Sequence, residues 1–343
     1  MIRRWFLLIP IGLVATVVAL QLTSAARSVS KSVSAAASAA DSTTTKQKPL
    51  IGFSQIGAES SWRIANTRSL KAAAESAGFQ LLIDDANQQQ ALQIEALDRF
   101  ILQKVDLLVF SPIVESGWHD VLLRAYRANI PVIVFDRSIE KKDFELVSAV
   151  ISADFLKEGE WATKCLFDSL PIAANRRHRI IELRGTTGSS AANLRHEGFL
   201  KVLKSRNDID VVTSVDGDFK ESLGKELIVE FLRPQKSSSL KIDGVFAHND
   251  SMALGAITAL EQNGYRPGRD VKVSSVDGIA DALKAILAGK LLCSAECSPM
   301  LGPIVMETAR KILQGEPYAK SIIANETLFD SSNAAKFLKT NRY

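Results

Sequence analysis

The chain has 343 residues, 46% of them hydrophobic and 23% charged, which is typical of globular proteins and long enough for two domains. The formal net charge is only +4 and no basic tract stands out, so the composition does not indicate a nucleic-acid partner. Neither paired histidines nor a second cysteine cluster accompanies the three cysteines, which argues against a metal-binding protein.

The N-terminus has the pattern of an export signal. Two arginines precede the uncharged, mostly apolar stretch 5–20, and the small residues 24–26 follow it. This order is typical of a secretory signal peptide, and we predict one over residues 1–26. The alternative is an uncleaved membrane anchor, because the apolar stretch nearly reaches the length that spans a bilayer. Either would place the rest of the chain in the periplasm.

Residues 27–48 are mostly Ser, Ala and Thr with scattered Lys, and they cannot build a hydrophobic core. We predict a flexible segment here, with ordered structure beginning at Pro49. A segment of this kind leaves open whether the mature protein is free or tethered.

From Pro49 the chain alternates between strand-like and helix-like segments. Short apolar runs indicate strands, and longer segments with apolar residues at helical spacing indicate helices. The first series is strand 50–54, helix 62–77, strand 79–83, helix 90–103, strand 106–110, helix 117–128 and strand 131–135. Three β–α units and a fourth strand predict a doubly wound parallel sheet.

The pattern then restarts, which predicts a second lobe of the same class. The second series is helix 161–170, strand 179–183, a helix ending at 203, strand 209–215, helix 222–232, strand 244–247, helix 251–263, strand 271–276, helix 280–287, strand 291–297 and helix 302–313. Two such lobes in tandem place a cleft between two sets of strand ends, where small ligands commonly bind.

The cysteines are Cys165, Cys293 and Cys297, and an odd number in an exported protein leaves at least one thiol free. We expect Cys293 and Cys297 on one strand, where a four-residue offset holds them too far apart to form a disulfide. Apolar residues lie near all three in sequence, so we expect buried structural thiols and no cofactor.

The strand expected at 131–135 ends in Asp136 and Arg137. A carboxylate offers acceptors and a guanidinium a planar set of donors, so together they can bind vicinal hydroxyls. Ligands bind at the carboxyl ends of strands in open α/β sheets, which favours a functional role for the pair. The alternative is a solvated pair at the start of an ordinary loop.

Polar residues recur at later strand ends, and we expect Asn249, Asp277 and Glu296 to contribute to the same site. Asp250, by contrast, is expected to cap the helix that begins at Ser251. Four polar strand ends in register with the sheets are harder to explain by chance than one.

Three aromatic residues stand at loops where a ring could stack on the apolar face of a sugar: Trp62, Trp118 and Phe219. Core packing is the ordinary alternative for each of them. The loop 185–190 lacks the lysine of a P-loop, and we expect it to turn closely and to position Arg195 in the following helix. The four histidines show no triad-like context, so the sequence favours a binding protein over an enzyme.

The ordered motifs resemble the periplasmic sugar-binding proteins of ABC importers, of the ribose/galactose type, which share their core with LacI-type effector domains. The segments that carry the resemblance are 51–54, 62–63, 135–137, 217–219, 248–250 and 276–278. More narrowly, 52–63, 111–118 and 136–139 resemble the galactofuranose-binding subgroup. Ser61, where that subgroup is expected to have Gly, and the long Ser/Ala leader depart from the pattern.

The resemblance implies a two-lobed, type I periplasmic-binding-protein-like α/β fold, each lobe a doubly wound parallel sheet with helices on both faces. It places lobe 1 at 49–152 and 297–323, and lobe 2 at 153–296 and 324–338, with crossings near 152–154, 296–297 and 322–324. The implied ligand-binding residues are Glu59, Trp62, Arg63, Asp136, Arg137, Arg195, Phe219, Asn249, Asp277 and Glu296.

The implied function is capture of a monosaccharide, galactofuranose or a related pentose or hexose, and its delivery to an ABC permease by an exported, monomeric protein. The alternative is a sugar sensor that docks to a chemoreceptor or a sensor-kinase ectodomain. A repressor is disfavoured, because a signal sequence stands where a helix-turn-helix would be.

Overall fold

The structure is a computed structural model, and it describes residues 48–172, 176–233 and 241–340. The predicted signal peptide, 1–26, and nearly all of the predicted flexible segment, 27–48, lie outside the described residues. No helix within the described ranges is both long and apolar enough to cross a bilayer.

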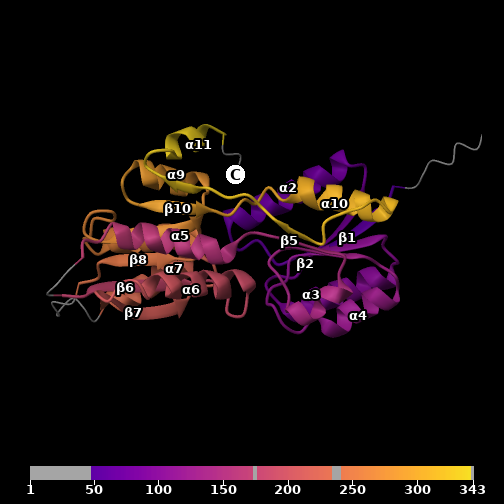
Figure 1. Cartoon of the computed structure of the whole chain (residues 1–343), viewed down its shortest axis with the longest axis horizontal. Helices are drawn as coiled ribbons and strands as arrows, with labels where there is room; N and C mark the ends of the chain where they lie inside the picture. The colour runs from indigo at the N-terminus through magenta and orange to yellow at the C-terminus, as the bar shows by residue number, and fades with distance from the viewer. Residues whose placement is uncertain (1–47, 173–175, 234–240, 341–343) are drawn as a thin grey trace, which may run out of the picture. The chain divides into compact units, whose positions relative to one another are not determined.

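Two six-stranded sheets form the framework of the described residues (Figure 1). Sheet A has the order β11-β5-β4-β3-β1-β2, and sheet B has the order β12-β10-β9-β8-β6-β7. Sheet A consists of β1 (Leu50–Gln55), β2 (Gln80–Asp85), β3 (Leu107–Phe110), β4 (Val132–Asp136), β5 (Ala149–Ser152) and β11 (Ser321–Ile323). Sheet B consists of β6 (His178–Arg184), β7 (Ile209–Asp216), β8 (Gly244–Ala247), β9 (Lys272–Asp277), β10 (Cys293–Glu296) and β12 (Leu328–Asp330).

All neighbouring strands are parallel except β12, which runs antiparallel to β10. The central strands β3, β4 and β8 are buried along their whole length, as expected of strands covered on both faces. The predicted fold class of two doubly wound sheets with helices on both faces is confirmed.

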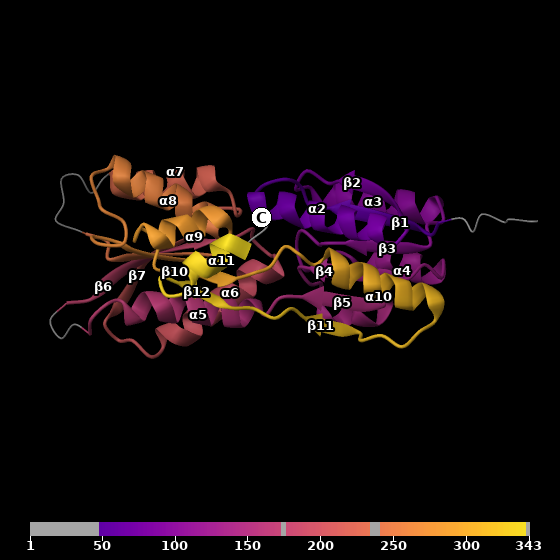
Figure 2. The same cartoon turned by 90° about the horizontal axis from the view of Figure 1, so that it is seen from above.

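Helices cover both faces of each sheet (Figure 2). On sheet A these are α2 (Ser61–Ser76), α3 (Gln90–Leu102), α4 (His119–Arg127), the 3₁₀ helix η1 (Lys141–Leu146) and α10 (Gly302–Gln314). On sheet B they are α5 (Phe155–Asp168), α6 (Ser190–Leu203), α7 (Glu221–Leu232), α8 (Asp250–Gln262), α9 (Ala280–Leu287) and α11 (Ala334–Thr340). Each sheet with its helices is called a lobe below, lobe 1 for sheet A and lobe 2 for sheet B.

The chain passes between the lobes three times: after β5, after β10 and after β11. These crossing segments lie side by side and are joined by backbone hydrogen bonds. Ala324 N donates to Ser152 O at 2.9 Å, and Glu296 N donates to Thr327 O at 2.7 Å. Each lobe is therefore assembled from separate parts of the sequence.

Several elements differ from the sequence-based expectation. The helix predicted at 161–170 begins at Phe155, because Asp154 caps it by accepting a hydrogen bond from Lys157 N at 3.1 Å. The short strand β12 and the last helix, α11, were not expected, and β5 and β11 were expected only as the crossings near 152–154 and 322–324. Three- and four-residue strands carry too little periodicity to be recognised in sequence.

The expectation for the cysteines was wrong in part. Cys165 on α5 and Cys293 on β10 form a disulfide that joins a helix of lobe 2 to its sheet. Cys297 is the free, buried thiol. The four-residue offset correctly ruled out a disulfide between Cys293 and Cys297. It did not bear on Cys165, which is distant in sequence but lies next to Cys293 in the folded lobe.

Candidate functional site

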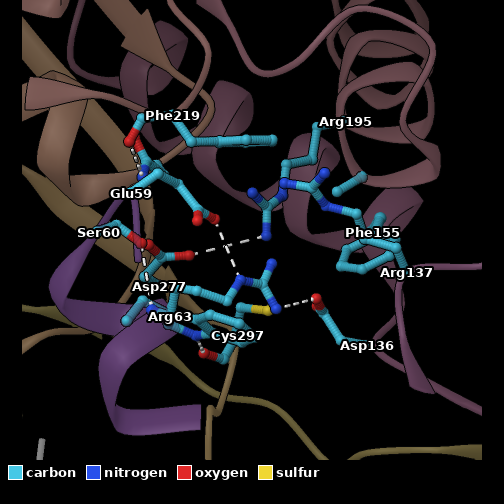
Figure 3. Close-up of a pocket in the computed structure, with 13 residues that line it drawn as sticks. Glu59, Ser60, Arg63, Asp136, Arg137, Phe155, Arg195, Phe219, Asp277 and Cys297 are labelled. Carbon is cyan, nitrogen blue, oxygen red and sulfur yellow. Dashed lines mark hydrogen bonds and ion pairs between the residues drawn. The ribbon is translucent and has the colours of Figure 1, made fainter. Parts of the chain in front are cut away.

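A cavity lies between the two lobes at the carboxyl ends of their strands (Figure 3). Its lining comes from both lobes. The lining residues are Glu59, Ser60, Trp62, Arg63, Asp136, Arg137, Phe155, Ala191, Arg195, Phe219, Asn249, Asp277 and Cys297.

Nine of the ten predicted ligand-binding residues are in this lining, and Glu296 is not. The next residue, Cys297, lines the cavity instead. Successive side chains of an extended segment point to opposite sides, so the two cannot both face the ligand space. Glu296 is half-buried and faces Thr327 in the third crossing segment, and burial raises the pKa of its carboxyl group.

The first turn of α2 supplies the lobe 1 loop of the site. The hydroxyl of Ser60 caps the helix by accepting from Arg63 N at 3.2 Å, which fixes Arg63 at the helix start. Arg63 Nε donates to Glu59 Oε1 at 3.1 Å, and Arg63 NH1 donates to Asp136 Oδ2 at 2.6 Å (Figure 3). Burial opposes ionisation of Arg63, but the charges of Asp136 and Glu59 outweigh it and raise the pKa of the guanidinium.

Asp136 and Asp277 hold corresponding positions in the two lobes, as the last residues of β4 and β9. Both have positive φ, 62° and 126°, which is unusual for residues other than glycine. Such backbone conformations persist where the surrounding structure enforces them, and they cluster at functional sites. Here they turn a carboxylate out of each sheet and into the cavity.

Arg137 is almost entirely buried, although it forms no ion pair with any described residue. Its NH1 donates to Ile113 O at 3.0 Å, and its guanidinium lies over the Phe219 ring, 5.0 Å from the centroid. Burial and the nearby charge of Arg63 lower the pKa of Arg137 to about 10. A buried guanidinium in this state is stabilised by donating a hydrogen bond to an additional oxygen atom, such as one of a ligand.

Arg195 projects from α6 into the lobe 2 side of the cavity. Its Nε donates to Glu158 Oε2 at 2.7 Å, its NH1 donates to His248 O at 2.6 Å, and its NH2 lies 3.8 Å from Asp277 Oδ1. A Cβ on Gly159 would lie 2.3 Å from Arg195 O, so only glycine lets α5 approach α6 this closely.

Two of the three candidate stacking aromatics lie in the cavity. The ring of Phe219 packs directly on Gly185, where a Cβ would lie 1.9 Å from the ring, and the guanidinium groups of Arg137 and Arg195 lie over it. Trp62 donates its indole N–H to Cys297 O in the second crossing segment. Trp118, in contrast, is fully buried against Phe110 in the core, so its stacking role was wrong.

The expected helix cap was also assigned to the wrong residue. Asn249, not Asp250, caps α8, since Asn249 Oδ1 accepts from Met252 N at 3.0 Å. Asn249 Nδ2 donates to Phe219 O at 3.1 Å, so the same side chain also braces the cavity loop. Asp250 is buried below the site, where it accepts hydrogen bonds from Ser294 and from the backbone of Gly278 and Ile279.

Four further residues line the cavity that the sequence did not predict there: Ser60, Phe155, Ala191 and Cys297. Ser60 could have been found as the cap of a helix that starts at the site. Phe155 was missed because the start of α5 was placed too late. Cys297 was read as a core thiol; burial and nearby Glu158 raise its pKa well above its usual value, so it is uncharged.

One acceptor in the cavity has no partner. Glu59 Oε2 is buried and makes no hydrogen bond to any described residue, whereas Oε1 of the same carboxylate is paired with Arg63. A buried unpaired carboxylate oxygen is costly, which makes it a ready acceptor for a ligand hydroxyl. The described residues hold no group of histidine, cysteine or acidic side chains arranged for a metal ion.

Known proteins match the chain along most of its length. Residues 51–317 match the family described as "Periplasmic binding protein domain". The galactofuranose-binding protein YtfQ of Escherichia coli is 37% identical over 294 residues, covering 85% of this chain and 91% of that protein.

Two solved structures are similar in both sequence and fold. A Mycobacterium smegmatis protein in complex with β-D-fucofuranose is 40% identical with a TM-score of 0.81, covering 85% of this chain and 94% of that one. The binding-protein component of the Shewanella sp. ANA-3 arabinose ABC transporter, bound to α- and β-L-arabinofuranose, is 37% identical with a TM-score of 0.79, covering 85% and 95%.

Proposed function

Because the chain belongs to the periplasmic binding protein family, we propose that it is an exported solute-binding protein that encloses a monosaccharide in its furanose form and delivers it to an ABC permease. The observation that carries this proposal is the cavity between the lobes, in which buried carboxylates and guanidiniums surround an unpaired acceptor, Glu59 Oε2.

The chemistry of the lining suits a polyhydroxylated, uncharged ligand. The carboxyl groups of Glu59, Asp136 and Asp277 accept from hydroxyl groups, while Arg137 and Arg195 donate to hydroxyl and ring oxygens. Phe219 and Trp62 offer apolar surface for the C–H face of a sugar ring. Because the charged groups already pair largely with one another, a neutral ligand leaves no net charge buried.

The furanose form is supported by the relatives. The names of the three similar proteins refer to galactofuranose, fucofuranose and arabinofuranose, which share a five-membered ring. Delivery to an ABC permease rests on the family and on the arabinose transporter relative. These relatives are named for binding and transport, which supports binding without turnover.

We further propose that the lobes, comprising 49–152 with 297–323 and 153–296 with 324–338, close on the sugar by a hinge motion. Contacts across the cleft support this proposal. Glu115 N donates to Gly188 O at 2.9 Å, and Ser138 N donates to Ser190 Oγ at 2.8 Å. Such bonds can form only when the lobes are together.

The test is a thermal-shift and calorimetric screen of the mature protein against galactose, arabinose, fucose, ribose and fructose, with ligand-observed NMR to identify the bound ring form. A ligand at 100 times its Kd should stabilise the protein by about 2.7 kcal/mol. Binding of a furanose form from a mixture of ring forms is the expected result. Failure of every sugar to stabilise the protein would refute the proposal, and selection of a pyranose would refute its furanose part.

A further inference from the structure

The third crossing segment carries a carboxyl group, Glu326, to the side chain of Glu158. Glu326 lies between β11 and β12, where its neighbours Ala324 and Thr327 are hydrogen-bonded to the first and second crossing segments. Its partner, Glu158, is fully buried in the first turn of α5, directly after the first crossing segment. The two side chains therefore connect the first and third crossings.

The two carboxyl groups face each other with few donors around them. Both oxygens of Glu326 and Oε1 of Glu158 are buried without a hydrogen bond of good geometry to any described residue, and only the backbone N–H of Asp154 approaches Glu326 as a donor. The two groups nevertheless lie within hydrogen-bonding reach of each other. Two ionised carboxylates in this position would repel each other and leave Glu158 Oε1 without a donor, whereas a single proton between them removes both costs.

We propose that Glu158 and Glu326 share one proton in the folded protein, with Glu326 donating to Glu158 Oε1, and that this pair positions Arg195 in the cavity. Glu158 Oε2 accepts from Arg195 Nε at 2.7 Å, so the chain of contacts runs from a crossing segment through α5 to a cavity-lining guanidinium. Glu326 is accordingly a positioning residue, since it acts on the cavity only through Glu158 and Arg195.

The surrounding charges favour the protonated form of Glu326. Burial and the neighbouring carboxylate of Glu158 raise its pKa far above the usual value, and together they outweigh Arg195 and the Asp154 backbone, which act in the opposite direction. The other ionisable groups at this point are Cys297, which is uncharged, and Asp277, which lies 3.8 Å from Arg195 NH2 and whose pKa is raised by burial. With the proton on Glu326, the pair carries one negative charge, on Glu158, whose Oε2 lies 2.7 Å from Arg195 Nε.

Infrared difference spectroscopy of the sugar-free protein tests the shared proton directly. Glu326→Gln preserves the shape and supplies an amide donor to Glu158, so this variant should fold normally. The difference between the wild-type and variant spectra at neutral pH should contain a protonated-carboxyl C=O band that belongs to the pair, while the signals of Asp250 and Asp277, which both proteins share, cancel. The matched control is Glu75→Gln, an exposed position on α2, which should retain the band. Identical spectra of wild type and Glu326→Gln in this region would overturn the proposal.

The pH dependence of stability gives a second, independent readout. Between pH 4.5, the usual pKa of a glutamate, and the raised folded-state pKa, the folded protein holds a proton that the unfolded chain has released. The stability from this group is therefore complete at low pH and is lost as pH rises through that window. The melting temperature of wild type relative to Glu326→Gln should fall between about pH 5 and about pH 9. Parallel profiles would contradict the shared proton.

The positioning of Arg195 by Glu326 matters for sugar binding, so this part of the proposal rests on the proposed function. It is tested by binding measurements, separately from the infrared and pH experiments. Glu326→Ala, which leaves Glu158 without a donor, should weaken sugar binding at least tenfold, whereas Glu326→Gln should bind within about threefold of wild type. Equal binding by wild type and both variants would overturn the positioning role. If no sugar binds even the wild type, the proposed function fails, while the infrared and pH results still decide the shared proton.

Discussion

Arg63 and Asp136 form an ion pair that is buried on both sides, with Arg63 NH1 2.6 Å from Asp136 Oδ2 and side-chain exposures of 3% and 5%. Ser111 Oγ donates to the same carboxylate oxygen at 2.8 Å. Asp136 was expected to act together with Arg137, its neighbour in sequence. Its closest cationic partner is instead Arg63 on α2, so the site is organised across elements rather than along the chain.

Replacing Asp136 should therefore affect both binding and folding. Asp136→Ala leaves Arg63 buried with only Glu59 as a partner, and breaking one side of a buried pair costs about 3–5 kcal/mol. Asp136→Asn should cost less stability, because asparagine accepts the positive φ of this position and still offers an oxygen. Both variants should lose sugar affinity. Chemical denaturation and calorimetry measure the two effects, and an unchanged Kd would remove Asp136 from the site.

Glu59→Gln tests the unpaired acceptor. The amide retains one oxygen for Arg63 but replaces a charged acceptor with a neutral group, so we expect a loss of about 1–3 kcal/mol in sugar binding, roughly 5- to 150-fold in Kd. Stability should change less, since Oε2 has no partner to lose in the protein. Calorimetric titration of this variant beside Glu75→Gln gives the comparison, and equal affinities would show that no hydroxyl meets Glu59.

The disulfide between Cys165 and Cys293 spans 128 positions of the chain. In the chain-entropy account, a loop of this length contributes about 4–5 kcal/mol by constraining the unfolded state. The double variant Cys165→Ala with Cys293→Ala should lose stability on this scale in denaturant unfolding. Thiol labelling of the wild type should detect one free thiol, Cys297, and only after unfolding. Three reactive thiols in the exported protein would disprove the pairing.

Asp250 should make stability depend on pH. Burial raises its pKa to about 6, although Ser275, Ser294 and two backbone N–H groups donate to it. The pKa of Asp250 in the folded protein is above the usual 3.8, so protonation of this group stabilises the folded state. Its contribution to the free energy of unfolding is complete at low pH and is lost as pH rises through about 6, an effect of up to about 3 kcal/mol.

Asp250→Asn should flatten this part of the stability profile. Its oxygen can accept from the backbone of Gly278 and Ile279, while its amide faces the serine hydroxyls. Denaturant unfolding of both proteins between about pH 4 and about pH 7 measures the difference. Superimposable profiles would mean that Asp250 stays ionised throughout.

Substitution of Asn193 tests whether contacts between the lobes stabilise the closed form, without changing a residue of the cavity. Its Nδ2 donates to Glu115 Oε2 of lobe 1 at 2.6 Å, and it does not line the cavity. Asn193→Ala should favour the open form and raise the sugar Kd about 2- to 10-fold, which small-angle scattering and calorimetry can follow. Glu197→Ala, one turn along the same helix and exposed, is the control. If both variants bind alike, the contact does not contribute to closure.

The sequence predicted correctly those site residues that stand at the ends of buried parallel strands. A parallel strand buried on both faces is an unbroken apolar run, so its end is easy to locate, and the polar residue that follows lies at the edge where ligands bind. Asp136 and Asp277 were found in this way. The resemblance to a known family added Arg195, Glu59 and Arg63, whose positions depend on loops and helix starts.

The wrong predictions also have physical causes, because they depend on features that local sequence patterns do not determine. Side chains alternate sides along a strand, so an error of one residue at the end of a short strand exchanges Glu296 and Cys297 at the cavity. Whether Asn249 or Asp250 caps α8 depends on where the helix begins, and both residue types cap well. The partner of Cys165 follows from tertiary structure, which no local pattern contains.

The three crossings also constrain the order in which the protein can fold. Helix α10 and strand β11, which complete lobe 1, are encoded after almost all of lobe 2. A chain emerging amino-terminus first would hold residues 48–152 with one face of sheet A uncovered beside α2 until α10 arrived. The exposed face would be apolar, since Leu301, Val305 and Met306 bury it in the finished lobe. Such a late-completed lobe suits a polypeptide that is translocated unfolded and folds only when its last segment is delivered.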